Sequence, residues 1–376
     1  MRKLALAALG GLMALPLSAQ ADDHDAVKVF YKNGTTIEFP DADIKFNVQL
    51  QPRYTYTDLD SEGRVDAGED PVDDTSSFSM RRARLIVTGN VLNKQFSYQL
   101  NNDFASSTGG GEMKDAWIQW NGEPMKIRFG QMKVPFTRQQ RVSSSKLFFP
   151  DRSLLDEVFS HDREFGVMGF FEAGEANLYT GLYNGDSTDE GKNRRGVDNK
   201  HNFYAAADFS SENFGSRGEE GDMRKDDRGL GFTVGGSLLY GEGESEDFGD
   251  DFDQIGLNAD AAIRVEGAEL QAEYYWVNAE ADSLDAELDR NGFYLQGTYM
   301  MDKIGVGGRF GLIEPDDDLG DFVGVDDIQE YTLGIDYFVN GHYLKVQNQV
   351  TFEVTNFEND DDLTDLRYVL QLSGYF

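Results

Sequence analysis

The stretch FNVQLQPRYTYT, residues 46–57, alternates apolar and polar side chains over its whole length. One face carries Phe46, Val48, Leu50, Pro52, Tyr54 and Tyr56. The other face carries Asn, Gln, Arg and Thr side chains. Successive side chains of a β-strand point to opposite sides, so this pattern predicts a strand between an apolar and a polar environment.

The same period of two recurs along most of the chain, for example in 255–266, 344–355 and 366–376. It predicts sixteen strands, near 43–57, 76–91, 94–106, 112–121, 125–131, 165–173, 175–184, 202–210, 228–242, 254–266, 268–280, 291–301, 305–314, 328–339, 342–356 and 365–376. Many of these segments have about 10 residues or more, which is the length that a tilted strand needs to cross a bilayer.

Alternation alone also suits a soluble β-sandwich or a β-solenoid. A sandwich of 376 residues needs two domains, but no linker rich in Pro, Gly or Ser divides the chain. A solenoid requires a fixed repeat, which the sequence lacks. We therefore predict an all-β fold, a transmembrane antiparallel β-barrel of about sixteen strands over residues 43–376, with its apolar face outward.

The ends of the predicted strands support this fold. Short connections, such as 121–124 and 266–268, alternate with long acidic ones, such as 58–74 and 314–327, as in outer-membrane barrels. Residues 1–21 have the basic start, apolar centre and A-x-A ending of a secretory signal peptide. Residues 22–42 are expected to form a short periplasmic segment before the barrel.

Positive charge is concentrated in two regions of an otherwise acidic chain, which has a formal net charge of −34. Residues 75–102 contain four basic residues and no acidic one. Residues 125–152 contain seven basic residues and one acidic residue, Asp151, for a net charge of +6. Both regions coincide with predicted strands or with the long connection that follows the fifth strand.

Several segments resemble the phosphate-selective porin O/P family of Gram-negative outer-membrane channels. They are VKVFYKNGTTIEF (27–39), FSMRRARLIVTGN (78–90), KDAWIQW (114–120), IRFGQMKVPFTRQQ (127–140) and DREFGVMGFFEAG with LYTGLYNGD (162–186). The resemblance implies a trimer of sixteen-stranded barrels, with a third loop folded inward as the constriction and arginines and lysines that attract anions. Met132 replaces a more usual aromatic residue, and the acidic loops depart from the family pattern.

The alternation assigns basic side chains to the lumen. Placing an arginine on the lipid face near mid-membrane costs roughly 2–4 kcal/mol, so the inward placement is favoured. This argument places Arg53, Arg82, Arg84, Lys126 and Arg128 in the pore. Arg81 has the parity of the lipid face and is expected near a strand end, at the interface or beside a bulge. The alternative role of the arginines is to pair with Asp103 and Asp115 alone.

The connection 131–164 is too long and too apolar to be an idle exposed loop. Folding it into the barrel as the constriction loop buries its Leu, Val and Phe side chains. It also brings Lys133, Arg138, Arg141, Lys146 and Arg152 to the narrowest part of the pore. The alternative is an exterior loop that packs on a neighbouring subunit.

The sequence therefore predicts an outer-membrane diffusion channel for small anions, phosphate or related, in a homotrimer surrounded by lipid and lipopolysaccharide. A general or cation-preferring porin and a plugged structural barrel are the alternatives. The acidic loops suit a solvated surface, a divalent-cation site that bridges lipopolysaccharide, or a negative vestibule. No enzyme motif surrounds His24, His161, His201 or His342. No catalytic residue, cofactor, metal site or nucleic-acid partner is expected.

Overall fold

The computed structural model describes residues 27–61, 64, 73–105, 111–185, 201–224, 229–245, 250–281, 286–315, 325–357 and 362–376. The expected signal peptide and residues 22–26 lie outside these ranges. Among the described residues, no helix is long and apolar enough to cross a membrane.

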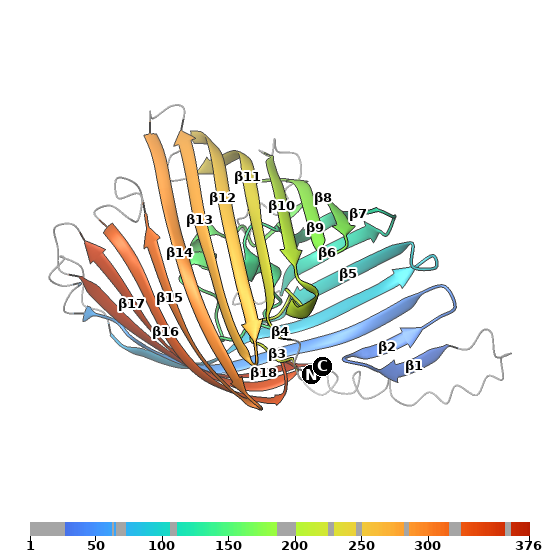
Figure 1. Ribbon diagram of the computed structural model, residues 1–376, viewed down its shortest axis with the longest axis horizontal. Helices are drawn as coiled ribbons and strands as arrows, with labels where there is room; N and C mark the ends of the chain where they lie inside the picture. The colour runs from blue at the N-terminus through green and yellow to red at the C-terminus, as the bar shows by residue number, and fades with distance from the viewer. Residues whose placement is uncertain are drawn as a thin grey trace, which may run out of the picture.

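Sixteen described strands, β3 to β18, form one antiparallel wall (Figure 1), which confirms the predicted barrel. They are β3 (Asp43–Asp58), β4 (Thr75–Val91), β5 (Phe96–Asp103), β6 (Glu112–Trp120), β7 (Met125–Lys133), β8 (Arg163–Ala173), β9 (Ala176–Tyr183), β10 (Asn202–Ser210), β11 (Gly231–Ser245), β12 (Asp250–Val265), β13 (Ala268–Ala281), β14 (Ala286–Met301), β15 (Ile304–Glu314), β16 (Val325–Asn340), β17 (Leu344–Phe357) and β18 (Leu363–Tyr375).

Pairing between the last and first of these strands closes the barrel. The register of β18 against β3 runs from Leu366 opposite Asp58 to Tyr375 opposite Gln49. The terminal residue continues the contact, because Phe376 and Val48 exchange two backbone hydrogen bonds of 2.9 Å. Closure leaves no free sheet edge in the membrane, where unpaired backbone groups are costly. A short hairpin, β1 (Lys28–Tyr31) and β2 (Thr35–Glu38), extends the sheet beside the start of β3.

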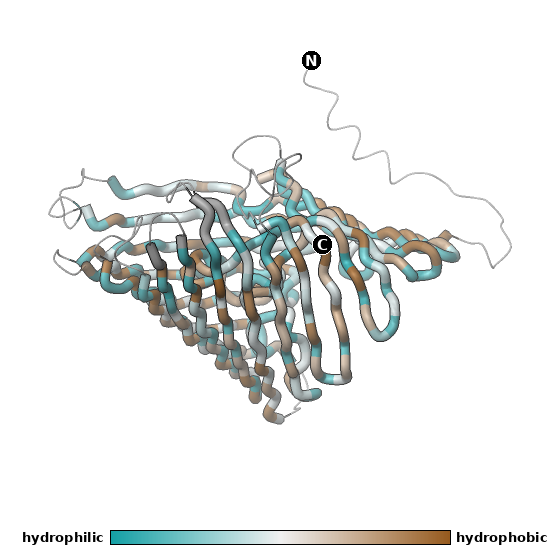
Figure 2. The backbone as a smooth tube through the Cα atoms, turned by 90° about the horizontal axis from the view of Figure 1, so that it is seen from above, coloured by the Kyte–Doolittle hydropathy of each residue, from teal (hydrophilic) through white to brown (hydrophobic). Residues whose placement is uncertain are grey.

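The two faces of the wall separate apolar from polar side chains, as the alternation predicts. In β16, Tyr331, Leu333 and Ile335 are exposed on the outside, whereas Glu330 and Thr332 are buried inside. Figure 2 shows the same alternation of hydrophilic and hydrophobic positions along many strands. The exposed apolar face is suited to lipid.

Short turns gather at one end of the barrel, with Phe376, and we call this the turn end; the opposite end is the loop end. Several hairpins at the loop end extend further than predicted. The β11–β12 ladder continues to Ser245 opposite Asp250, and β13–β14 to Ala281 opposite Ala286. Residues between the predicted strands 228–242 and 254–266, and between 268–280 and 291–301, are thus partly strand, because backbone pairing continues beyond the alternating apolar pattern.

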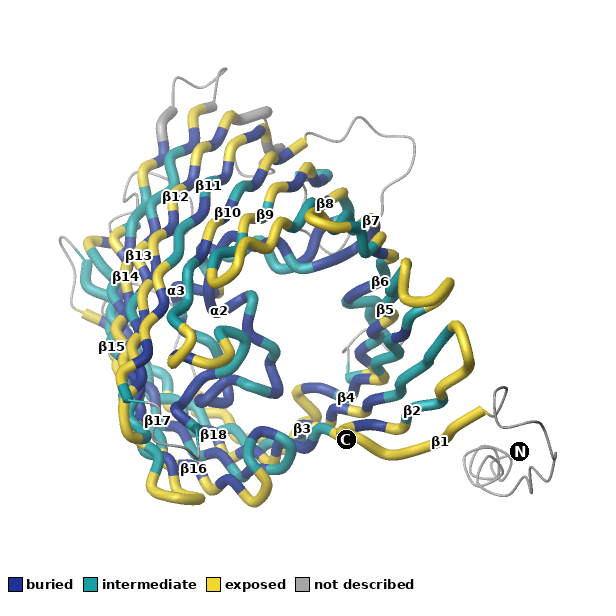
Figure 3. The backbone as a smooth tube through the Cα atoms, turned by 45° about the vertical axis from the view of Figure 1, so that its right-hand side comes forward, coloured by how far each residue is buried: buried dark blue, intermediate teal, exposed yellow. Residues whose placement is uncertain are grey.

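Residues 134–162 connect β7 to β8 and fold into the barrel interior, and we call them the inward loop (Figure 3). The loop is slightly shorter than the expected 131–164, because residues 131–133 and 163–164 belong to the flanking strands. It contains two short helices, α2 (Arg138–Arg141) and α3 (Leu154–Phe159). Thr137 and Ser153 cap them, each accepting a backbone N–H with its hydroxyl oxygen.

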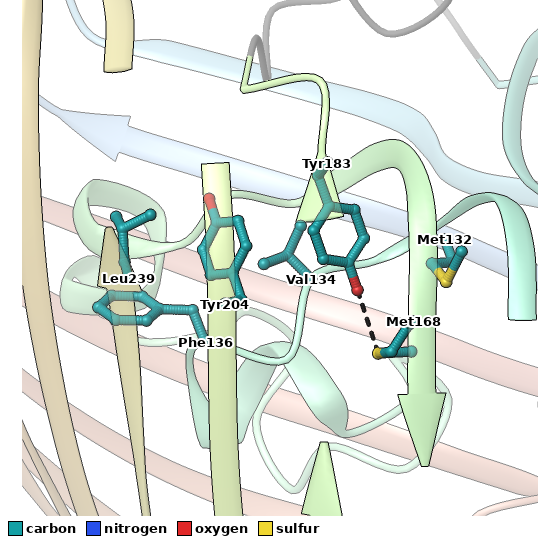
Figure 4. Close-up of a cluster of buried hydrophobic side chains, with 7 residues drawn as sticks. All are labelled: Met132, Val134, Phe136, Met168, Tyr183, Tyr204 and Leu239. Atoms are coloured by element: carbon teal, nitrogen blue, oxygen red, sulfur yellow. Dashed lines mark hydrogen bonds between the residues drawn. The ribbon is translucent and has the colours of Figure 1, made fainter. Parts of the chain in front are cut away.

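Apolar side chains of the inward loop pack on one half of the wall. Val134 and Phe136 join Tyr183, Tyr204 and Leu239 in a buried cluster, in which the Tyr183 hydroxyl contacts Met168 Sδ at 3.1 Å (Figure 4). Farther along the loop, Leu155 and Phe159 pack on β13 and β14, and Phe148 and Phe149 pack near Phe338. Each such side chain stabilises the docked loop by roughly 1.5–3 kcal/mol.

Inward-facing glycines of the wall make room for these side chains. A Cβ added to Gly307 would lie 2.8 Å from Phe148 and 3.2 Å from Phe149. A Cβ on Gly311 would lie 2.7 Å from Leu155. The absence of wall side chains at these positions therefore allows close contact between the loop and the sheet.

Buried charges also fix the inward loop. Asp151 accepts hydrogen bonds of 3.0 and 2.9 Å from Arg53 of β3, and Arg81 lies 3.7 Å away. Burial alone would raise the pKa of the Asp151 carboxyl, but Arg53, Arg367 and Arg81 stabilise the carboxylate and lower this pKa below its usual value. On the opposite wall, Arg309 donates to the backbone oxygen of Arg152 at 3.0 Å.

We expect Gly307→Leu to loosen the inward loop, because the added side chain overlaps the Phe148 ring. Overpacking of this kind costs about 1–3 kcal/mol. The measurements are thermal unfolding in detergent and single-channel conductance, which should become larger or noisier. The adjacent variant Gly308→Leu is the matched control, since the nearest atom to its Cβ is 3.4 Å away, on Leu333 of the outer face. Equal unfolding temperatures and conductances of the two variants would contradict the packing of Phe148 against Gly307.

We expect Asp151→Asn to destabilise the protein by roughly 3 kcal/mol at neutral pH, because it leaves buried Arg53 without its carboxylate. The pKa of Asp151 is depressed in the folded state, so its stabilising contribution is complete above the ordinary carboxyl pKa of about 4. The contribution is lost as the pH falls below that value. Melting curves from pH 7 to pH 2 should show the difference between wild type and variant shrinking only at the acidic end; a constant difference would refute this role.

Candidate functional site

The inward loop leaves open the half of the barrel formed by β3 to β9 (Figure 3). A cavity of about 1080 Å³ lies there, between these strands and the loop. Its lining extends from Lys45, near the turn end of β3, to Ala105, beyond the loop end of β5. The cavity therefore spans the depth of the wall, as a channel past the loop would.

Basic residues dominate the cavity lining. Six of the predicted residues are present: Arg82, Arg84, Arg128, Lys133, Arg141 and Arg152. Four further basic residues are Lys45, Arg81, Lys114 and Arg163. The acidic lining residues in the described chain are Asp103, Glu112, Asp115 and Asp162. Ten positive against four negative charges give a net charge of +6, opposite in sign to the whole chain.

A β-bulge explains how consecutive arginines of β4 reach the same cavity. Opposite β3, Gln51 pairs with Arg82 and Pro52 with Met80, so Arg81 is the extra residue. A bulge resets the alternation, and both Arg81 and Arg82 therefore line the cavity. Sequence alternation alone had assigned Arg81 the parity of the lipid face, with a bulge as one of its possible settings.

Four cavity cations have no carboxylate within ion-pair distance among the described residues: Lys45, Arg82, Arg128 and Lys133. Arg82 is only 5% exposed and donates to Gln51 Oε1 at 2.9 Å, while its Nε has no described partner. Lys133 donates to the backbone oxygens of Gln140 and Val142 at 2.6 and 2.9 Å. These contacts hold the side chains without neutralising them, so a mobile anion can supply the missing charge.

The other predicted lining residues carry compensated charges. Arg84 pairs with Asp103 at 2.7 Å and donates to Ser144 Oγ at 3.2 Å. Arg141 pairs with Asp208 at 3.1 Å, and Arg152 pairs with Asp156 at 3.3 Å. Asp115 pairs with Arg163 at 3.2 Å. The alternative role, pairing with Asp103 and Asp115, therefore applies to Arg84 and Arg163 and leaves Arg82 without a carboxylate partner among the described residues.

Arg53, Lys126, Arg138 and Lys146 are not among the residues that line this cavity. Each has a carboxylate partner instead. Arg53 holds Asp151, and Lys126 pairs with Glu172 at 2.8 Å beside a turn. Arg138 pairs with Asp260 at 3.2 Å behind the loop, and Lys146 pairs with Glu219 at 3.6 Å. Alternation gives the face of a residue but not the partner that it meets there.

A second inward segment, residues 211–224 between β10 and β11, was not predicted. It includes a short 3-10 helix, η2 (Glu212–Phe214), and approaches the inward loop from the turn end. Its buried Glu220 accepts from Gln139 Nε2 at 3.0 Å and from Phe148 N at 2.8 Å. The two segments together occupy the half of the lumen opposite the cavity. The connection between β10 and β11 is unusually long for the turn end. This length is the sequence signal that could have indicated an inward segment.

No group of His, Cys, Asp or Glu in the described chain has the arrangement of a metal site. His161 of the inward loop packs on Phe136 and Tyr204. Burial lowers the pKa of His161 to about 4, so the ring is neutral at pH 7. It therefore adds no positive charge near the channel at neutral pH.

Comparisons with known proteins agree with this architecture. A relative, Porin O of Pseudomonas aeruginosa, is 24% identical over 98% of this chain and 99% of its own. Among solved structures, the outer-membrane channel DcaP of Acinetobacter baumannii has a TM-score of 0.64, with 15% identity over 89% of this chain and 98% of its own. The anion-selective porin from Comamonas acidovorans has a TM-score of 0.60, with 12% identity over 89% and 100%.

A trimer form of OmpT, an outer-membrane protein of Vibrio cholerae, also has a TM-score of 0.60, with 14% identity over 89% of this chain and 100% of its own. At these identities, the structural neighbours establish the barrel fold. The family model described as phosphate-selective porin O and P matches residues 46–352, which cover most of the wall and the whole inward loop. The chain therefore belongs to this family of Gram-negative outer-membrane porins.

Proposed function

We propose that the protein is an outer-membrane diffusion channel for small anions, phosphate among them, with the uncompensated cavity cations as its filter. The observation that carries this proposal is the lining itself: Arg82, Arg128 and Lys133 face the cavity without a carboxylate partner in the described chain. Rings of Arg and Lys are typical of anion pores. A guanidinium also offers planar paired donors that match the oxygens of phosphate or carboxylate.

The position of the filter supports the same function. Arg82 comes from the wall, whereas Arg152, which also lines the cavity, comes from the inward loop. An anion that passes the loop therefore meets basic side chains of both the wall and the loop. A low-dielectric wall around this passage strengthens its attraction for anions.

The second candidate is a general or cation-preferring porin, which the acidic composition favours. The whole chain has a formal net charge of −34, whereas the residues that line the cavity have a net charge of +6. An acidic entrance would concentrate cations before the basic filter is reached. Ion selectivity therefore discriminates directly between the two candidates.

We infer further that the protein acts as a channel without a catalytic reaction, and that it assembles as a homotrimer in lipid and lipopolysaccharide. The OmpT structure with the same barrel fold occurs in a trimer form, which supports the assembly. The exposed apolar face of the wall supports the lipid environment.

We expect Arg82→Gln to lower the permeability ratio of chloride to potassium by about tenfold, because losing a positive charge about 6 Å from the ion path disfavours chloride by roughly 0.7 kcal/mol in water and favours potassium by the same amount. The measurement is the reversal potential of the purified protein in a planar bilayer under a KCl gradient. Lys126→Gln removes the same charge outside the cavity and should leave the ratio unchanged. Cation preference in the wild type would instead establish the second candidate.

We also expect inorganic phosphate to reduce the chloride current of the wild type. Control recordings in KCl without phosphate, at the same ionic strength, should show no such reduction. The reduction should weaken in Arg82→Gln and in Lys133→Gln, since both lose a donor that no described carboxylate neutralises. Equal phosphate sensitivity in the wild type and both variants would show that phosphate is not held at this filter.

A further inference from the structure

A row of aromatic and cationic side chains crosses the cavity wall on β6 to β9. The Arg128 guanidinium lies 3.9 Å from the centre of the Trp117 ring and 4.6 Å from that of Phe170. Phe170 then meets Tyr179 edge to face, with ring centres 5.7 Å apart. All four side chains line the cavity and are half-buried.

Strand pairing produces this row. Phe170 of β8 lies directly opposite Tyr179 of β9, and Arg128 of β7 lies opposite Gln119 of β6. The row therefore belongs to the rigid wall rather than to a loop. Arg128 is three residues from the turn-end start of β7, so the row lies towards the periplasmic end of the channel.

Aromatic side chains on this surface need a physical reason. Several other inward aromatics of the wall, such as Tyr204 and Tyr294, are fully buried against the inward loop. Trp117, Phe170 and Tyr179 instead keep part of their surface open to the cavity, where water would otherwise contact it. An apolar surface beside a cation is typical of sites for amphiphilic anions.

Arg128 retains capacity for such a ligand. Its Nε and Nη2 both donate to Gln119 Oε1, at 3.0 and 2.8 Å. No acceptor for Nη1 is found in the part of the chain that the structure describes, and no described carboxylate lies within ion-pair distance. The two flanking rings also exclude water from the guanidinium faces, which favours a weakly hydrated anion over a strongly hydrated one.

We propose that Arg128, Trp117, Phe170 and Tyr179 form a second subsite in the channel, for small aromatic carboxylates. The carboxylate would accept from Arg128, and the aromatic ring would lie against the open edges of Phe170, Tyr179 and Trp117. This proposal rests on the proposed anion channel and adds a substrate class to it. The subsite is separate from Arg82, which lies on β4 and not on β6 to β9.

The test is inhibition of the chloride current through the full-length protein in a planar bilayer by benzoate, acetate and cyclohexanecarboxylate. Benzoate should halve the current at a concentration about fivefold lower than acetate or cyclohexanecarboxylate, as expected for one favourable aromatic contact. Phe170→Leu and Trp117→Leu should bring benzoate to the level of acetate while keeping the wild-type reversal potential in KCl. Should one of them fail to assemble, Tyr179→Leu provides the same comparison.

Phe129→Leu is the matched control, because Phe129 follows Arg128 in β7 but is exposed on the outer face. It should retain the preference for benzoate. Equal inhibition by benzoate and acetate in the wild type would overturn the subsite. So would a loss of chloride selectivity in Phe170→Leu and Trp117→Leu that matches the loss of benzoate inhibition, since the rings would then serve only to hold Arg128. The reversal potential in KCl reports on the proposed anion channel independently.

Discussion

The structure depends on one constraint, that every backbone N–H and C=O within the lipid must have a hydrogen-bond partner. A sheet meets this constraint only by closing on itself, and the pairing of β18 with β3 closes it here. Closure then divides each strand into an apolar outer face and a polar inner face. The interior becomes a wide space with polar walls, and its filling determines what can pass.

Two segments fill one half of that space and leave the other half open. The inward loop enters from the loop end, and residues 211–224 approach it from the turn end, meeting at Glu220. Apolar side chains of the loop contact the wall where wall residues are glycine, as at Gly307 and Gly311. The inward loop therefore packs closely on this part of the wall, and the open cavity lies on the other side, along β3 to β9.

The basic side chains of the barrel interior have two different roles. Behind the loop, Arg138 and Arg309 are paired with carboxylates and fix the fold. Within the cavity, Arg82 and Lys133 are held by neutral oxygens and have no carboxylate partner among the described residues. The same residue types thus stabilise the protein on one side of the loop and attract anions on the other.

The sequence by itself determined the barrel, its sixteen strands and the inward position of the long loop, because period-two alternation and strand length reflect the two solvents directly. It also identified Arg82, Arg84 and Lys133 as inward residues. Only the tertiary structure decided which cations remain unpaired, since Arg53 and Lys146 meet their carboxylate partners across strands and loops far apart in sequence. The bulge at Arg81 and the contacts of the inward segment 211–224 with the inward loop likewise depend on long-range pairing, which the alternation within a single strand does not determine.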